Sequence, residues 1–167
     1  LRGPRGQGLL YAARSTVGRL QPSAPDLHGG HWLAPQQMAL RPDARRFETW
    51  EFDVAGRLGV GEALAYALDW GVVNIEARVR DLARQLRDQL CAISGVQTHD
   101  PGPNPCGIVS FTVQGREPAE VKAALFADSI TVSTVTPASS LLDMQPRQLT
   151  GLVRASVHYY NSDEDLA

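Results

Sequence analysis

The sequence predicts an α+β fold, and three observations indicate it. Apolar residues recur at helical spacing over residues 58–68 and again over residues 75–90, which predicts two consecutive helices. Residues 108–113 alternate between apolar and polar side chains, as a half-buried strand does. A second alternating run covers residues 152–160. The second half of the chain therefore has the pattern of an α+β domain.

Length and composition limit the classes of protein that this chain can belong to. Its 167 residues are enough to bury a hydrophobic core, and 43% apolar with 20% charged residues is typical of soluble globular proteins. A net charge of −2 gives no electrostatic reason to expect a nucleic-acid or membrane partner. No apolar run is long enough to cross a bilayer. We therefore expect a cytoplasmic protein. Because the chain begins with Leu1, we also expect it to be a piece of a longer polypeptide.

The first half contains four predicted elements. After a glycine-rich turn, the apolar run at residues 8–12 predicts a short buried strand. Residues 21–43 are rich in Pro, Gly and His without a clear period, which predicts a long loop. The helix over residues 58–68 is expected to stop at Gly71. Asn74 can cap the next helix, whose apolar stripe extends from Ile75 to Leu90.

The second half is predicted to mix strands with one helix. A Pro/Gly-rich turn at residues 100–105 precedes the strand at 108–113. Glu117 and Pro118 are suited to open a helix that continues to about Phe126, because proline is tolerated at the first helical position. Strands are expected at residues 130–135 and 152–160, and in the latter Arg154 lies on the polar face.

Histidines and cysteines are interpreted as ordinary side chains. The two cysteines, Cys91 and Cys106, are too few for a disulfide framework and lack zinc-ligand spacing. His28 and His31 flank two glycines, which disfavour the helix that would place both rings on one metal. We therefore expect no metal site at these two histidines. His99, Asp100 and Cys106 are interpreted as a turn and not as a thiol site.

Arg154 is the strongest candidate for binding chemistry. A guanidinium on a rigid strand offers two parallel N–H donors that match a carboxylate in a way that lysine cannot. On spacing alone, an ordinary surface arginine on a half-exposed strand is the competing interpretation.

Two segments at the ends of the chain resemble a known family. Val153-Arg154-Ala155-Ser156-Val157-His158-Tyr159-Tyr160-Asn161 and the opening glycine-rich run are similar to stretches of class V aminotransferases. These fold-type I enzymes use pyridoxal 5'-phosphate (PLP) and include cysteine desulfurases and C–S lyases. The resemblance implies that Arg154 binds the substrate α-carboxylate. In that family the glycine-rich run follows immediately after the lysine that forms the Schiff base with PLP, so the resemblance also implies that this lysine lies upstream of residue 1. Lys122 lies on an ordinary predicted helix and is not expected to replace it.

A third segment, residues 45–51, resembles the stretch of the family whose threonine reaches the cofactor phosphate of the partner subunit. Here Thr49 comes earlier, and Trp50 replaces part of the Gly-Thr-Pro core. The resemblance implies that Thr49 and Trp50 bind the cofactor in a homodimer, and core packing is the alternative for Trp50. Residues 133–144 contain serines and threonines where cysteine desulfurases carry their persulfide-forming cysteine. Desulfurase chemistry by that route is therefore not expected.

The resemblance leads to one reading of the whole chain. Residues 1–45 are predicted to be the remnant of the PLP-binding large domain, residues 46–93 connecting helices, and residues 94–167 the small α+β domain. The expected function is that of the C-terminal part of a PLP enzyme that transaminates a small amino acid or cleaves its C–S bond, with the fragment alone inactive. A racemase of the same family is a second possibility. A stand-alone small domain that serves binding or oligomerisation without a cofactor is the alternative.

Overall fold

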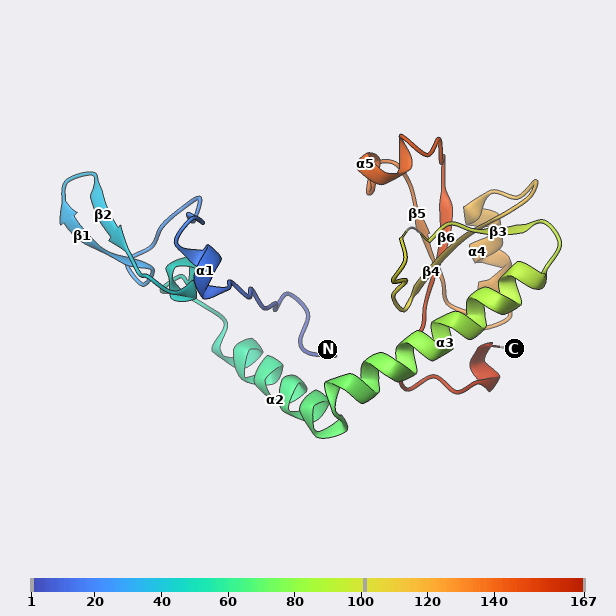
Figure 1. Cartoon of the computed structure of the whole chain (residues 1–167), viewed down its shortest axis with the longest axis horizontal. Helices are drawn as coiled ribbons and strands as arrows, with labels where there is room; N and C mark the ends of the chain where they lie inside the picture. The colour runs from blue at the N-terminus through green and yellow to red at the C-terminus, as the bar shows by residue number, and fades with distance from the viewer. Residues whose placement is uncertain (1, 101, 167) are drawn as a thin grey trace. The chain divides into compact units, whose positions relative to one another are not determined.

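The structure is a computed structural model that describes residues 2–100 and 102–166. The chain folds as two compact units, Leu1–Asp69 and Trp70–Ala167 (Figure 1). Leu1 and the Pro101 position of the predicted 100–105 turn lie outside the described residues. The expected α+β class is confirmed, with helices and antiparallel sheets in one chain. The three-part division at residues 45 and 93 stays a prediction.

The first unit contains a β-hairpin where the sequence predicted a loop. Strands β1 (Gly30–Ala34) and β2 (Gln37–Leu40) pair antiparallel within residues 21–43. The turn between them is tight because Gln36 adopts a φ of 63°, a conformation that the glycine-based turn signals did not mark. The predicted strand at residues 8–12 is also wrong. That segment has no strand partner, and Tyr11 is 88% exposed.

A buried arginine fixes the middle of the first unit. Arg46 lies in the short 3-10 helix η1 (Ala44–Phe47), and only 8% of its surface is exposed. Its Nη1 donates to the carbonyl oxygens of Val17, in helix α1 (Arg14–Val17), and Leu20 at 2.9 and 2.8 Å. Its Nε donates to the carbonyl oxygen of Arg41 at 2.8 Å. Because a buried charge requires such hydrogen bonds, Arg46 has a structural role here.

Both predicted helices are present, and the second starts earlier than expected. Helix α2 (Val54–Trp70) begins after Asp53, whose Oδ1 accepts from the backbone N–H of Gly56 at 2.9 Å. Gly71 ends it with a φ of 82°, as expected for a helix stop. Helix α3 (Val72–Ala92) then starts before Asn74, so the predicted Asn74 cap is wrong. The Asn74 amide instead donates to the carbonyl oxygen of Trp70 at 3.1 Å.

The second unit is built on a four-stranded antiparallel sheet. Its strands are β3 (Val96–Thr98), β4 (Ile108–Val113), β5 (Ser133–Val135) and β6 (Leu152–Ser156), in the order β3-β4-β6-β5. The strands β4, β5 and β6 were predicted, although β5 and β6 are shorter than expected. Beyond the end of β6, the Val157 N–H still donates to the carbonyl oxygen of Gly107, and the Asn161 side chain accepts from the N–H of His158. β3 was not predicted.

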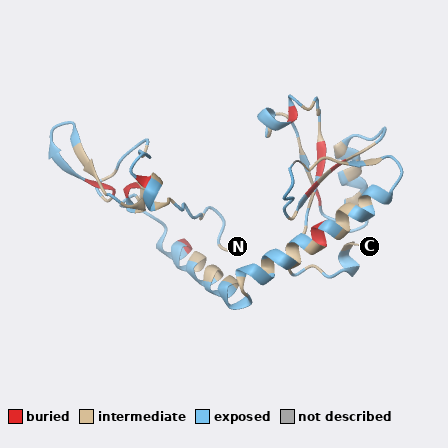
Figure 2. Ribbon diagram, viewed as in Figure 1, coloured by how far each residue is buried: buried red, intermediate tan, exposed pale blue. Residues whose placement is uncertain are grey.

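One face of this sheet forms the hydrophobic core. Phe111 and Val153 are 5% and 0% exposed, and Leu90 of α3 with Val121 and Leu125 of α4 (Pro118–Ala127) packs against them. Figure 2 shows the buried positions along β4 and β6. Helix α4 opens as predicted, with the side chain of Glu117 in a capping box. Short helices α5 (Leu141–Met144) and η2 (Glu164–Leu166) complete the unit.

None of the helices within residues 2–100 and 102–166 is both long enough and apolar enough to span a bilayer.

Candidate functional site

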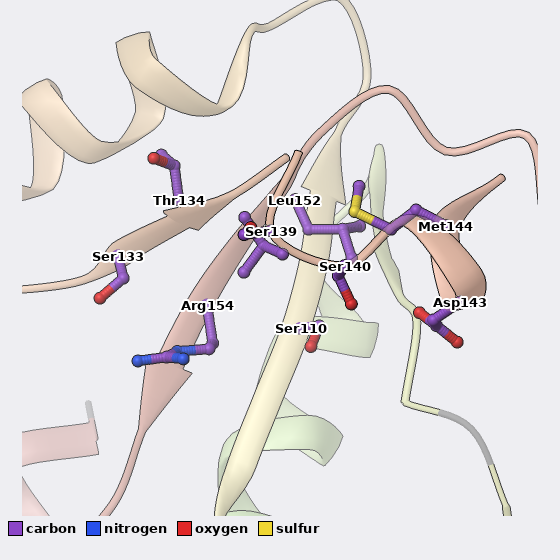
Figure 3. A pocket seen from close by; sticks show the side chains of 10 residues that line it. Ser110, Ser133, Thr134, Ser139, Ser140, Asp143, Met144, Leu152 and Arg154 are labelled. Carbon is purple, nitrogen blue, oxygen red and sulfur yellow. The ribbon is translucent and has the colours of Figure 1, made fainter. Parts of the chain in front are cut away.

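The other face of the sheet carries an open pocket of about 440 Å³. Strands β4, β5 and β6 form its floor, and the segment that leads into α5 forms one wall (Figure 3). Its lining is rich in hydroxyl groups, together with one guanidinium and one carboxylate. The residues that supply these polar groups are Ser110, Ser133, Ser139, Ser140, Asp143 and Arg154. Thr134 also borders the pocket, but it is paired with Val153 on the core face of the sheet.

Arg154 lies on β6, the strand between β4 and β5. Side chains alternate along a strand, so the burial of Val153 in the core places Arg154 on the pocket face. The residue is exposed. Within the described part of the chain, its guanidinium forms no hydrogen bond and no ion pair. By contrast, Arg84 and Arg87 on α3 are each paired with carboxylates of the chain. Arg154 therefore keeps its donors available for an anionic ligand.

Three polar contacts hold the wall opposite Arg154 in place. Met144 is fully buried beneath this wall. The Arg147 guanidinium forms an ion pair with Asp143 at 2.8 Å and donates to the carbonyl oxygen of His99. The His99 ring hydrogen-bonds the hydroxyl of Thr112 at 2.8 Å. Because Arg147 already neutralises Asp143, the unpaired charge of this pocket is the positive charge of Arg154.

The protonation equilibrium of the His99 imidazole, near the pocket wall, is shifted by its surroundings. Partial burial lowers the pKa of the His99 imidazole below its ordinary value, since the protonated ring loses solvation there. The positive charge of Arg147 lowers this pKa further, and the carboxylate of Asp100 opposes both effects. The neutral form of His99 is therefore favoured in the folded chain.

Thr49 and Trp50 lie in the first unit, between η1 and α2, and thus in a different unit from Arg154. The Thr49 hydroxyl donates to the carbonyl oxygen of Glu51 at 2.9 Å, and the residue is exposed. Trp50 is 66% exposed, which excludes core packing within this unit. Its ring centroid lies 6.0 Å from that of His28 in an edge-on contact.

His28 belongs to a small polar cluster beside Trp50. The Nε2 atom of His28 lies 3.1 Å from Oε2 of Glu48. The backbone N–H of His28 donates to the Asp26 carboxylate at 2.8 Å. The same carboxylate accepts from the backbone N–H of Trp50 at 3.2 Å. Asp26 therefore fixes the backbone of both aromatic residues. Across the described ranges, no three His, Cys, Asp or Glu side chains gather as metal ligands would. Cys91 and Cys106 are exposed free thiols.

The groups around Thr49 are compatible with a PLP phosphate and ring. A phosphate requires hydrogen-bond donors, and the Thr49 hydroxyl can rotate from the carbonyl oxygen of Glu51 to an external acceptor. A pyridine ring requires a flat partner, and the exposed indole of Trp50 offers one. Lys122, on α4, is not among the residues that line the pocket of Arg154.

Comparison with known proteins identifies the family. The model of the aminotransferase class-V family matches residues 1–167. The chain belongs to this family, as its end segments predicted.

Three similar proteins agree with that assignment. A probable cysteine desulfurase of Methanothermobacter thermautotrophicus is 29% identical, with 98% of this chain and 42% of the relative covered. A cysteine desulfurase structure from Escherichia coli superimposes with a TM-score of 0.78 over 98% of this chain and 40% of that one, at 22% identity, which shows the fold. The cystine C–S lyase C-DES superimposes with a TM-score of 0.75 at 20% identity, over 99% of this chain and 40% of the lyase. That structure is of a variant with glycine covalently linked to the PLP cofactor. The chain spans about 40% of the length of these relatives.

Two pocket residues were not singled out from the sequence. Ser110 and Ser133 lie beside Arg154 on β4 and β5. For Ser110 a signal was available, because it lies on the polar face of the alternating run at residues 108–113. Ser133 was noted only as the first residue of segment 133–144. Its place beside Arg154 depends on the pairing of β5 with β6, which joins positions that are far apart in sequence.

Proposed function

We propose that this chain is the part of a PLP-dependent class V enzyme that binds a small amino acid by its α-carboxylate. The observation that carries the proposal is the exposed guanidinium of Arg154 in a hydroxyl-rich pocket, without an internal anionic partner among the described residues. A guanidinium binds a carboxylate through two parallel N–H···O bonds. Arg154 then fixes the position and orientation of the amino acid.

The remaining parts of the site are proposed as follows. Thr49 donates to the phosphate and Trp50 packs on the ring of PLP, within a homodimer. As the resemblance of the opening glycine-rich run implies, a lysine upstream of residue 1 forms the Schiff base. Lys122 does not take this role, because it lies on α4 outside the pocket. When bound, PLP supplies an electron sink for bond cleavage at the amino acid. The chain alone is expected to bind its substrate without turnover.

We infer transamination or C–S bond cleavage as the reaction class. The relatives' names include a cysteine desulfurase and a cystine C–S lyase, the latter solved with its product cysteine persulfide. A persulfide carried on the enzyme requires a cysteine thiol at the pocket. Several of the residues that line the pocket bear hydroxyl groups, and neither Cys91 nor Cys106 is among the lining residues. This composition favours a reaction in which sulfur does not pass to a thiol of the enzyme.

The test is a titration of this chain with L-alanine, followed by the NMR signal of the Arg154 Nε–H group and by backbone amides. Arg154→Gln should weaken binding by about tenfold or more, because a charge-assisted hydrogen-bonded pair is lost. Arg154→Lys should recover part of the affinity, because lysine restores the positive charge but not the two parallel N–H donors of the guanidinium. L-alaninamide, which lacks the carboxylate, should bind poorly to every variant.

Arg116→Gln is the matched control, because Arg116 is an exposed arginine of the same unit outside the pocket. It should bind L-alanine as the unmodified chain does. Equal affinity of Arg154→Gln and the unmodified chain would refute the proposal.

A further inference from the structure

Two serines are in register with Arg154 on the strands at either side of it. In the pairing of β4 with β6, Ser110 lies opposite Arg154. In the pairing of β5 with β6, Ser133 lies opposite the same residue. Directly opposite residues share a face of the sheet, with Cβ atoms about 4.5–5.5 Å apart. Figure 3 shows Arg154 between the two serines on the floor of the pocket.

The hydroxyls of both serines are available for a ligand. Within residues 2–100 and 102–166, neither the Ser110 nor the Ser133 hydroxyl forms a hydrogen bond with another group of the chain. Ser139, on the pocket wall, differs because its hydroxyl donates to the carbonyl oxygen of Thr136 at 3.0 Å. The backbone of Ser110 is also held in place, since its N–H donates to the Asp100 carboxylate at 2.8 Å. A fixed strand thus presents an uncommitted donor.

The small size of the Ser110 and Ser133 side chains affects ligand access to the Arg154 guanidinium as much as their polarity does. A long side chain at either position would cover the guanidinium, because cross-strand neighbours are within contact distance. Serine leaves the guanidinium open and adds one O–H donor on each side. A carboxylate has about four lone-pair sites, of which a bidentate guanidinium uses two. Two acceptor sites remain for hydroxyl donors.

We propose that Ser110 and Ser133 bind the same ligand carboxylate as Arg154, each donating its hydroxyl hydrogen to a carboxylate oxygen. This inference rests on the proposed function and adds two binding residues to it. The three residues form a carboxylate cradle, defined as Ser110, Arg154 and Ser133, across three adjacent strands. The cradle selects a planar carboxylate over an uncharged amide at the same position, because an amide offers one oxygen acceptor and an N–H₂ group that cannot accept.

The experiment measures the dissociation constant of L-alanine by the same NMR titration of the full chain. Ser110→Ala and Ser133→Ala should each weaken binding by about tenfold, the effect of one hydrogen bond to a charged group. Ser133→Thr should bind as the unmodified chain does, because threonine restores the hydroxyl and is well tolerated in strands. Thr131→Ala removes an exposed hydroxyl outside the pocket and should change nothing.

The outcomes separate this inference from the proposed function. If Arg154→Gln abolishes binding while both serine variants bind as the unmodified chain does, the carboxylate cradle is wrong and the proposed function stands. If Arg154→Gln binds normally, both are wrong. If Ser133→Thr binds as weakly as Ser133→Ala, the hydroxyl is not the donor and the assignment of Ser133 is overturned. Far-UV circular dichroism of each variant confirms that the sheet is folded.

Discussion

The ion pair between Arg87 and Asp100 is expected to be a major source of stability in the second unit. Its side chains are 15% and 12% exposed, and Nε of Arg87 lies 2.6 Å from Oδ2 of Asp100. The same guanidinium donates to the carbonyl oxygens of Cys106 and Ile108, both at 2.8 Å. The other oxygen of Asp100 accepts from the N–H of Ser110. The pair therefore joins α3 to the beginning of β4.

Asp100→Ala would leave a largely buried guanidinium without its counter-ion. Removal of one partner of a buried pair costs about 3–5 kcal/mol, and the residual exposure of both groups places this pair near the lower value, about 3 kcal/mol. For a unit of about 100 residues, each kcal/mol lowers the melting temperature by about 4–8 °C. The expected decrease in Tm of the second unit is therefore about 15 °C.

Thermal unfolding followed by circular dichroism provides the assay, and the control is Arg84→Ala on the same helix. Arg84 pairs with Asp81 and Asp88, but its side chain is 63% exposed, so its loss should leave Tm almost unchanged. A double-mutant cycle with Arg87→Ala should show a coupling of about 1 kcal/mol or more. A Tm of Asp100→Ala equal to that of Arg84→Ala would refute this reasoning.

Two more predictions concern pH and backbone packing. Because the folded pKa of His99 is below its unfolded value of 6.5, the unfolded chain binds the proton more tightly, so stability is complete above that pH and decreases as pH falls below it. Urea unfolding from about pH 7.5 to 5 should show a shallower decrease in His99→Asn than in the unmodified chain, and equal slopes would contradict the assignment. Gly29→Ala should destabilise the first unit by about 1–3 kcal/mol, because the new Cβ would lie 2.6 Å from the carbonyl oxygen of Arg46. Gly18→Ala, where a Cβ meets nothing within 4 Å, is its control in the same urea titration.

The elements that the sequence predicted well are those with strong local signals. α4 has its capping residue, its proline and its acidic first turn within four positions, and β4 has six alternating residues. β3 has three residues and depends on its pairing with β4, which no local pattern reveals. The hairpin at Gly30–Leu40 was missed because its turn uses Gln36 at positive φ in place of glycine.

A site residue could be predicted from the sequence where its own side chain has a distinctive binding chemistry, as a guanidinium has. Arg154 was singled out by its residue type and by the resemblance, and the structure places it in the pocket. Its carboxylate-binding role stays a prediction. Ser110 and Ser133 could not be recognised as site residues from the sequence, because only the cross-strand register places positions 110 and 133 beside position 154. Arg46, within the segment that resembled a cofactor-binding stretch, is committed instead to three backbone carbonyls. Whether Thr49 and Trp50 contact a cofactor stays a prediction.

The strand order of the second unit has a thermodynamic consequence. A ligand held by residues from β4, β5 and β6 contacts a surface that exists only in the folded sheet, because the three positions are scattered along the unfolded chain. By linkage, such a ligand at a hundred times its dissociation constant adds about 2.7 kcal/mol to the free energy of unfolding. A ligand of this face should therefore protect the second unit from thermal unfolding in proportion to the logarithm of its concentration.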